Sequence, residues 1–398
     1  MLGSFVIFPA SGNVRHQMLV FRPDHQSQRD GAKMRAVLCR ALGDPTKPQD
    51  AGGALAVENV PSPRCPRDGV KVKVEAAALN FADLLMIKGE YQEKPRLPFI
   101  PGGEFAGVVT ECGANVRGVK IGDRVAGVTM GGGAMAEETV ANAASVFPVP
   151  DGVTLEQAAA FPVAFGTAHL ALTRYARVTK GSTVLILGAA GGVGLAAVQI
   201  AKALGCVVVA AANGVRKMDA LRDAGADHCI DASLLHSADG GGIRAGRRDD
   251  YAGLKGAVAR ALNGGGDGLK SFKGVDVLLD PVGGDGFTQG LRCVRWGGKV
   301  MVLGFASGIV PKLPLNLPLV KNIAVHGVYW GAHASKDPRS MRESLADALG
   351  MLADGRCVVK VSDTFGMDDA YAGFKTLAER RAVGKVVVAP GLVGRSRL

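Results

Sequence analysis

The feature that most constrains this chain is a glycine-rich turn, GAAGGVG at residues 188–194, which lies between the apolar segment TVLIL and the helical stretch VGLAAVQIAKALG. Glycines let the turn tighten and let backbone N–H groups approach a pyrophosphate, whose charge then faces the positive end of the helix. Inside a strand–turn–helix unit, this pattern is typical of dinucleotide binding. It predicts that the cofactor contacts Ala190, Gly191, Gly192, Val193 and Gly194.

The segments around this turn alternate between apolar strand-like runs and helical stretches. The strand-like runs are TVLIL, CVVVAAA, HCID, GVDVLLD and KVMVLGF. Such alternation predicts parallel strands joined by crossover helices, which form a doubly wound sheet. Residues 35–149 differ, because short β-type segments separated by turn residues predict a compact, mostly β domain there. The predicted fold class is therefore α/β with a second, mostly β domain.

The residues after the second predicted strand indicate which dinucleotide binds. An NAD site usually has an acidic residue roughly 20 positions after the glycines, to hold the ribose hydroxyls. No Asp or Glu occurs from Gln157 to Met218, and the strand CVVVAAA is followed by Asn213, Arg216 and Lys217. These two cations can pair with a 2′-phosphate, which favours NADPH. The alternative is that both are solvated cations at a helix start.

Residues 79–91, LNFADLLMIKGEY, interrupt the strand pattern of the first domain with the polar residues Asn80, Asp83 and Tyr91. Hydride addition to a conjugated carbonyl develops negative charge on oxygen, so its site needs hydrogen-bond donors rather than a strong base. Asn80 and Tyr91 can supply such donors. The alternative is that they are ordinary turn or strand-end residues.

Composition excludes several classes of protein. The formal charge is +11, but aromatic residues make up only 5%, and no basic cluster interleaved with aromatics indicates a nucleic-acid surface. The seven cysteines are scattered, and no set of His, Cys and carboxylates has metal-ligand spacing. No apolar run approaches the roughly 18 residues that a membrane span needs. We therefore expect no metal site, no membrane segment and no dedicated nucleic-acid site.

Three segments do not fit the two predicted domains. Residues 1–33 carry three arginines and no acid before Asp24, but Asp24 and Asp30 fit poorly with acid-poor mitochondrial presequences. A disordered extension is therefore favoured over a presequence. Residues around 237–250 and 264–273 are rich in Gly, Asp and Arg, which predicts surface insertions without chemistry.

Several motifs together resemble the zinc-free quinone oxidoreductases of the medium-chain dehydrogenase/reductase superfamily. They are NFADLLMIKGEYQEKP, PGGEFAG, GDRVAGV, FPVAFGTAHLAL, GAAGGVG, DPVGGD and LPLVKNIAVHGVYWG. The resemblance covers about residues 35–389. It implies a GroES-like catalytic domain made from residues 34–163 and 335–398, and a dinucleotide-binding domain over 164–334. It also implies a homodimer, for which KNIAVHGVYWG is the candidate edge strand.

The resemblance assigns roles to single residues. It implies that Asn80 and Tyr91 lie beside nicotinamide and substrate, and that Thr167 lies near the nicotinamide carboxamide. The other cofactor contacts it implies are Gly191, Gly192, Gly194, Lys217, Gly304, Phe305 and Lys385. Zinc-dependent members have a Cys near the position of Asn80 and a His near Gly103, and this chain has neither. Some quinone reductases have a tyrosine at the position of Leu85, so the preferred quinone is left open.

The sequence thus predicts an NADPH-dependent reductase that transfers hydride to a quinone or another α,β-unsaturated carbonyl without zinc. An enoyl-thioester reductase is the alternative enzyme, because related mitochondrial enzymes have a tyrosine at the position of Tyr91. A non-catalytic NADPH- or RNA-binding protein is the alternative of another class. We expect the cytoplasm as the compartment, with the mitochondrion as the alternative.

Overall fold

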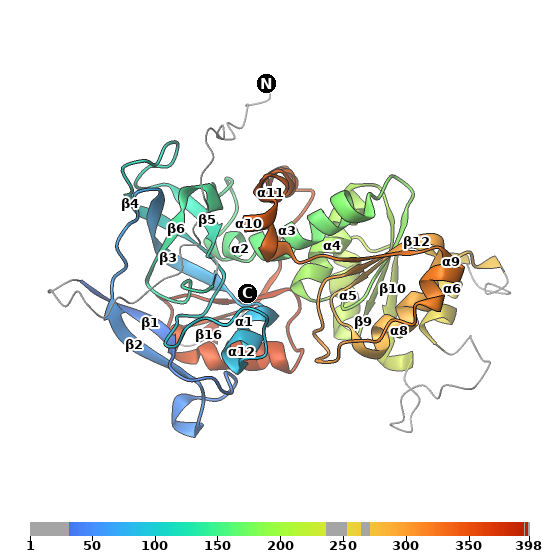
Figure 1. Cartoon of the computed structure of the whole chain (residues 1–398), viewed down its shortest axis with the longest axis horizontal. Coiled ribbons are helices and arrows are strands. Elements are labelled where there is room, and N and C mark those ends of the chain that lie inside the picture. The colour runs from blue at the N-terminus through green and yellow to red at the C-terminus, as the bar shows by residue number, and fades with distance from the viewer. Residues whose placement is uncertain (1–31, 130, 236–252, 264–270, 394, 397–398) are drawn as a thin grey trace. The chain divides into compact units, whose positions relative to one another are not determined.

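The computed structural model describes residues 32–129, 131–235, 253–263, 271–393 and 395–396 (Figure 1). Most of the predicted extension and of the two predicted insertions lies outside these residues. The chain forms two units, each compact in itself. The first consists of Met1–Val149, Phe365–Lys375 and Val387–Arg395, and the second of Pro150–Thr364, Thr376–Val386 and Ser396–Leu398.

The first unit is mostly β, as predicted. Its strands are β1 (Lys33–Cys39), β2 (Leu55–Pro61), β3 (Gly69–Ala78), β4 (Glu104–Cys112), β5 (Arg124–Val128), β6 (Glu138–Asn142) and β7 (Val146–Pro148). Successive side chains of a strand point to opposite faces of the sheet. In the VKVKV segment of β3, Val70, Val72 and Val74 are therefore buried, whereas the two lysines between them are more exposed. β3 pairs antiparallel with β4 and β6. Among the described residues before position 150, the one α-helix of this unit is the eight-residue α1 (Phe81–Lys88).

Two segments near the end of the chain, Phe365–Lys375 and Val387–Arg395, belong to the first unit. The last strands are β14 (Val361–Phe365), β15 (Lys385–Val388) and β16 (Arg395–Ser396), and α12 (Ala370–Ala378) lies between β14 and β15. In β15, Val387 and Val388 pair antiparallel with Ala78 and Ala77 of β3. The larger sheet has the order β16-β14-β15-β3-β4-β5-β7, and β1 pairs with β2 in a separate sheet.

The second unit contains a six-stranded parallel sheet with the order β10-β9-β8-β11-β12-β13. Its strands are β8 (Thr183–Ile186), β9 (Val207–Ala212), β10 (His228–Asp231), β11 (Val275–Asp280), β12 (Val294–Val302) and β13 (Ala324–Gly327). From β8 the chain first adds strands on one side and then on the other, so the direction reverses between β8 and β11. In doubly wound sheets, ligands bind at the carboxyl ends of the strands at this reversal.

Helices connect these strands (Figure 1). They are α4 (Gly192–Ala203), α5 (Arg216–Asp223), α6 (Leu254–Asn263), α8 (Gly284–Cys293) and α9 (Asn316–Lys321). The strand residues Leu185, Leu278 and Val300 are fully buried and pack with α6 and α8 in one apolar core. Continuous apolar strands of this kind are expected where helices cover both faces of a parallel sheet.

A second group of helices belongs to the same unit. It comprises α2 (Leu155–Ala159), α3 (Pro162–Leu170), α10 (His333–Lys336) and α11 (Pro338–Ala353), and α3 continues as a π-helix over Ala171–Ala176. α3 packs against α4 and α11. Among the described helices, none is both long and apolar enough to cross a membrane.

Candidate cofactor and substrate sites

The glycine-rich turn follows β8 and leads into α4, as predicted. Gly188 has a φ of +55°, and the Gly191 amide donates to the Gly188 carbonyl at 3.0 Å. A Cβ on Gly194 would lie 2.5 Å from the Gly188 carbonyl oxygen and 2.6 Å from the Cα of Ala189. No side chain fits there without moving the backbone, so this glycine is required for the helix to pack so closely against the turn.

The first turn of α4 can bind an anion. Gly191 is the N-cap and is exposed, whereas Gly192 and Val193 are partly buried and Ala190 is buried. The first amides of a helix have no acceptor within the helix, and the helix dipole adds positive potential there. The turn lies at the carboxyl end of β8, at the strand reversal, where a pyrophosphate would fit.

Lys385 lies against this turn although it is almost 200 positions away in sequence. The neighbouring Gly384 amide donates to the Ala190 carbonyl at 2.9 Å, and Gly384 forms a parallel bridge with Gly191. A Cβ on Gly192 would lie 2.5 Å from Cδ of Lys385. The structure therefore brings Gly191, Gly192 and Lys385 together, and Lys385 adds a cation beside the start of α4.

Cations gather beyond the end of β9. Asn213 and Arg216 are exposed, and the half-buried Lys217 donates from Nζ to the Arg380 carbonyl at 2.9 Å. Burial lowers the pKa of Lys217, and the charge of Arg380 lowers it further. Arg380 has a φ of +55°. Sequence reasoning missed Arg380, because 163 positions separate it from Lys217.

Sequence reasoning also missed Asp231 at the end of β10. Its Oδ1 accepts from the Gly214 amide at 2.8 Å, from the Ser233 amide at 3.0 Å and from the Ser233 hydroxyl at 2.6 Å. The hydrogen bonds from the Ser233 hydroxyl and the Gly214 amide hold the pKa of Asp231 below its ordinary value. A carboxylate thus reaches the turn after β9 from the neighbouring strand, and it fixes the backbone that precedes Arg216 and Lys217.

Asp280, the last residue of β11, organises the loop that contains Gly304 and Phe305. Its side chain is fully buried, and Oδ1 accepts from the amides of Val282 at 2.7 Å and Gly283 at 3.0 Å. Burial raises the pKa of Asp280, although these two hydrogen bonds act in the opposite direction. Its backbone carbonyl accepts from the Leu303 amide at 2.9 Å. The motif DPVGGD contained this signal, but sequence reasoning gave it no role.

The loop between β11 and α8 contacts both the glycine-rich turn and Phe305. A Cβ on Gly188 would lie 2.7 Å from Cγ2 of Val282, and one on Gly283 would lie 2.9 Å from Cδ1 of Phe305. Thr167 lies on α3 and is nearly buried, and α3 packs against α4. The loops that follow β8, β11 and β12 therefore lie against one another, and they carry the glycine-rich turn, Gly304 and Phe305.

Asn80 is the N-cap of α1, and carboxyl side chains hold it. The Asn80 amide group donates from Nδ2 to Oε1 of Glu104 at 2.9 Å, and its backbone N–H donates to Oδ2 of Asp83 at 2.8 Å. Glu104 is fully buried and Asp83 is 2% exposed. Sequence reasoning missed Glu104, which lies on β4. Tyr91 is half-buried and follows Gly89, the C-cap of the same helix.

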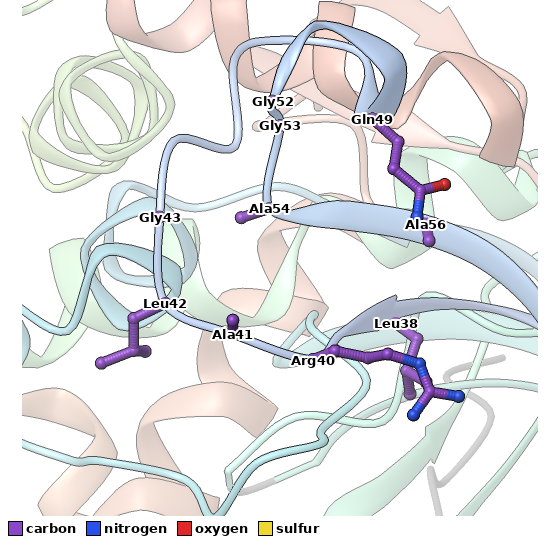
Figure 2. Close-up of a pocket in the computed structure, with 10 residues that line it drawn as sticks. All are labelled: Leu38, Arg40, Ala41, Leu42, Gly43, Gln49, Gly52, Gly53, Ala54 and Ala56. Atoms are coloured by element: carbon purple, nitrogen blue, oxygen red, sulfur yellow. The ribbon is translucent and has the colours of Figure 1, made fainter.

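A cavity of about 240 Å³ in the first unit is lined by none of these predicted residues (Figure 2). Arg40 at its edge forms an ion pair with Glu58. Figure 2 shows that loop backbone and small side chains form most of its wall, so it offers little chemistry. Within the described residues, no group of three or more His, Cys, Asp or Glu side chains is placed to hold a metal ion.

Comparison with known proteins agrees with this architecture. Residues 66–151 match the alcohol dehydrogenase GroES-like domain, and residues 192–350 match the family described as zinc-binding dehydrogenase. A mycobacterial protein solved in complex with NADPH is 28% identical, with a TM-score of 0.75, and the match covers 90% of this chain and 100% of that one.

Two curated relatives are similar over most of this chain. A mycocerosic acid synthase-like polyketide synthase of Mycobacterium tuberculosis is 31% identical over 82% of this chain, which corresponds to 14% of that protein. The quinone oxidoreductase-like protein 2 homolog of Nematostella vectensis is 36% identical over 355 residues, 89% of this chain and 88% of that protein. The chain therefore belongs to the quinone oxidoreductase-like proteins of the medium-chain dehydrogenase/reductase superfamily.

Proposed function

We propose that this protein is an NADPH-dependent reductase that transfers hydride to a quinone or another α,β-unsaturated carbonyl without zinc. The observation that carries the proposal is the cation group beyond β9, where Lys217 is held by the Arg380 carbonyl beside Arg216. A 2′-phosphate carries about two negative charges and accepts hydrogen bonds, so such cations favour it over a ribose hydroxyl.

The remaining cofactor contacts follow from the geometry of the second unit. The amides at the start of α4, with Lys385 beside them, suit a pyrophosphate. Thr167, Gly304 and Phe305 are proposed to border the nicotinamide. The mycobacterial protein of similar fold was solved in complex with NADPH, which supports the choice of cofactor.

Asp231 is the feature that most directly opposes NADPH, because a carboxylate near a 2′-phosphate would repel it. Its Oδ1, however, accepts hydrogen bonds from the amides of Gly214 and Ser233. These bonds offset part of its charge and direct that oxygen into the backbone of the turn. Asp231 is therefore proposed to shape the turn rather than to bind ribose.

For the reaction, the bound nicotinamide supplies the hydride. Asn80 and Tyr91 are proposed to orient the acceptor carbonyl and to stabilise the negative charge that develops on its oxygen. The contact with Glu104 fixes the orientation of the Asn80 amide group. Tyr91 or water then supplies the proton. Zinc is not required for this chemistry, and this chain has neither the Cys near Asn80 nor the His near Gly103 that the resemblance implies for zinc-dependent relatives.

An enoyl-thioester reductase is the second candidate, because hydride addition to an enoyl thioester needs the same donors. The similarity to a segment of a polyketide synthase favours it, since polyketide assembly proceeds on acyl thioesters. Steady-state turnover on quinones, small enones and an enoyl thioester, each with NADPH and NADH, separates the two candidates. The absence of NADPH oxidation with every acceptor would contradict both.

The cofactor preference is tested by Lys217→Ala. We expect kcat/KM with NADPH to fall about ten- to a hundredfold, because a charged hydrogen bond contributes roughly 1.5–3 kcal/mol, whereas kcat/KM with NADH should not change. Lys120→Ala removes an exposed lysine of the first unit and is the control. Wild-type preference for NADH would contradict the proposed cofactor.

We also propose that the protein forms a homodimer through β13, with cytoplasmic localisation retained as an expectation. β13 is an edge strand of the parallel sheet, and Leu315, Leu319 and Val320, just before it in sequence, are exposed apolar residues. An exposed edge strand offers unpaired backbone groups to a second copy. Val325→Pro should shift the mass measured by light scattering from dimer to monomer, and a monomeric wild type would contradict the proposal.

A further inference from the structure

A second cavity of the second unit is lined almost entirely by cationic and aromatic side chains. Its volume is about 480 Å³, and its lining residues are Arg174, Tyr175, Arg177, Lys299 and His326. Pockets that bind small molecules have volumes of roughly 300–1,000 Å³. We propose that this cavity is a separate binding site for a small organic anion that carries phosphate or carboxylate groups.

The charges of the lining are only partly compensated. Of the five lining residues, only Arg174 has a carboxylate partner within the described part of the chain, Asp337 at 2.8 Å. Lys299 donates from Nζ to the Ala176 carbonyl at 2.7 Å, and Arg177 donates from Nε to the Arg174 carbonyl at 3.4 Å. Carbonyls orient these cations but do not neutralise them. About two positive charges therefore remain at the cavity, which a dianion would offset.

The backbone that presents these side chains is unusual. Ala171–Ala176 form a π-helix, a rare conformation that occurs often at functional sites. The next residue, Arg177, has φ 51° and ψ 52°, a left-handed conformation that costs energy for a residue other than glycine. This irregular segment carries three of the five lining residues. The surrounding structure maintains a costly conformation at the point where the cations converge.

Tyr175 is fixed as a wall of the cavity. Its hydroxyl lies 3.0 Å from Nε2 of His333, and Nδ1 of His333 lies 3.0 Å from the Tyr329 carbonyl. A carbonyl can only accept, so Nδ1 of His333 carries a proton and its hydrogen bond to Tyr329 fixes the ring beside the Tyr175 hydroxyl. The ring centroid of Tyr175 is 5.9 Å from that of His326. These two rings suit an anion with a flat unsaturated or aromatic part.

The cavity is distinct from the proposed cofactor site. The glycine-rich turn follows the carboxyl end of β8, whereas His326 lies on β13, three strands farther along the sheet. Three strand spacings are about 14 Å. Lys299 is level with Val184, near the start of β8, because both are in register with Val277. His326 is level with Ile186 at the carboxyl end of β8, so the separation is across the strands rather than along them. The cavity therefore lies three strands from the turn, beside the β13 edge that is proposed above to pair in a homodimer.

The test is calorimetric titration of the full chain with inorganic pyrophosphate, citrate and phenyl phosphate, with and without saturating NADPH. We expect saturable binding of at least one probe at one site per chain, unchanged by NADPH. The preferred probe identifies phosphate or carboxylate as the recognised group. Arg177→Gln with Lys299→Gln should weaken binding by about tenfold or more, since two charged hydrogen-bond donors are lost.

Two controls keep the test decisive. Lys120→Gln removes one positive charge from the first unit and should leave binding unchanged, and Arg177→Lys should retain most of it if the double variant does not fold. An unchanged NADPH affinity checks that the variants are folded. The proposal is overturned if no probe binds saturably, if NADPH abolishes binding, or if the cavity variants bind as the wild type does.

Discussion

The two regions proposed to meet cofactor and substrate are constructed in different ways. At the start of α4 the binding groups are backbone amides, and Gly194 leaves no room for a side chain beside Gly188. In the first unit the polar group is a side chain, Asn80, which Glu104 and Asp83 hold by hydrogen bonds. Cofactor binding by backbone amides should be weakened by any side-chain atom added at the turn. The substrate site should instead be impaired when a single hydrogen-bonding side chain is removed.

Gly194→Ala should have the largest effect. The added Cβ would meet backbone atoms at 2.5–2.7 Å, so the turn or α4 must shift. We expect NADPH affinity to fall about a hundredfold or more, with a loss of roughly 1–3 kcal/mol in the free energy of unfolding. Titration of cofactor binding and urea denaturation measure the two effects.

The matched control is Gly350→Ala on α11, where a Cβ would meet nothing within 4 Å. Alanine is favoured over glycine inside a helix, so this variant should be neutral or slightly more stable. If Gly194→Ala bound NADPH as well as Gly350→Ala does, the backbone of the turn would not be the binding element.

Asn80→Ala tests the other region. It removes the donor to the fully buried Glu104, which should lower the free energy of unfolding by about 1–3 kcal/mol. If Asn80 also stabilises the developing oxyanion, kcat should fall about ten- to a hundredfold or more. NADPH affinity should remain at the wild-type value. An equal loss of kcat and NADPH affinity would break the division between the two regions.

Tyr91→Phe should have a smaller effect on the same region. The variant keeps the ring and removes only the hydroxyl, so the fold should be preserved. A few-fold to tenfold loss of kcat is expected if the hydroxyl donates to the substrate oxygen or supplies the proton. Unchanged turnover would make Tyr91 a packing residue and would leave Asn80 as the proposed donor of the first unit.

Asp280→Asn tests a site that combines both arrangements, because a buried side-chain carboxyl group accepts hydrogen bonds from the backbone amides of a loop. Burial raises the pKa of Asp280 above its unfolded value of about 3.9, so the folded state holds more protons between these two values. Stability from this group is therefore present below the unfolded pKa and is lost as pH rises through the folded pKa. Asparagine still offers an oxygen to the Val282 and Gly283 amides.

The free energy of unfolding of Asp280→Asn should therefore lack the pH dependence that Asp280 causes. Near neutral pH, the variant should be at least as stable as the wild type. Urea denaturation between about pH 4 and pH 8 measures it. Parallel stability curves for wild type and variant would show that Asp280 does not titrate in this range.

Much of the fold follows from local patterns. The alternating valines of β3 and the apolar runs of β8, β9 and β11 predicted strands. These patterns suffice because burial of one or both faces of a strand repeats with a short period along the chain. The glycine-rich turn was found in the same way, since its conformation depends on its own residues. The edge position of the segment that contains β13 was implied by the family resemblance rather than by a local pattern.

The partners of the functional groups could not be found from local pattern. Glu104 holds Asn80, Asp231 holds the turn before Lys217, and the Arg380 carbonyl accepts from Lys217 itself. These pairs are 24, 17 and 163 positions apart. Which strands become neighbours and which ends meet depends on the order of the sheets.

The sequence by itself determined the class of fold, the turn suited to a dinucleotide and the chemical character of the residues near it. Tertiary packing selects which buried carboxyl groups and carbonyls hold those residues, and it brings the cations of the π-helical segment and of β12 to one cavity. The physical reason is that periodicity records which face of an element is buried, whereas hydrogen bonds between distant segments arise only when those elements pack together.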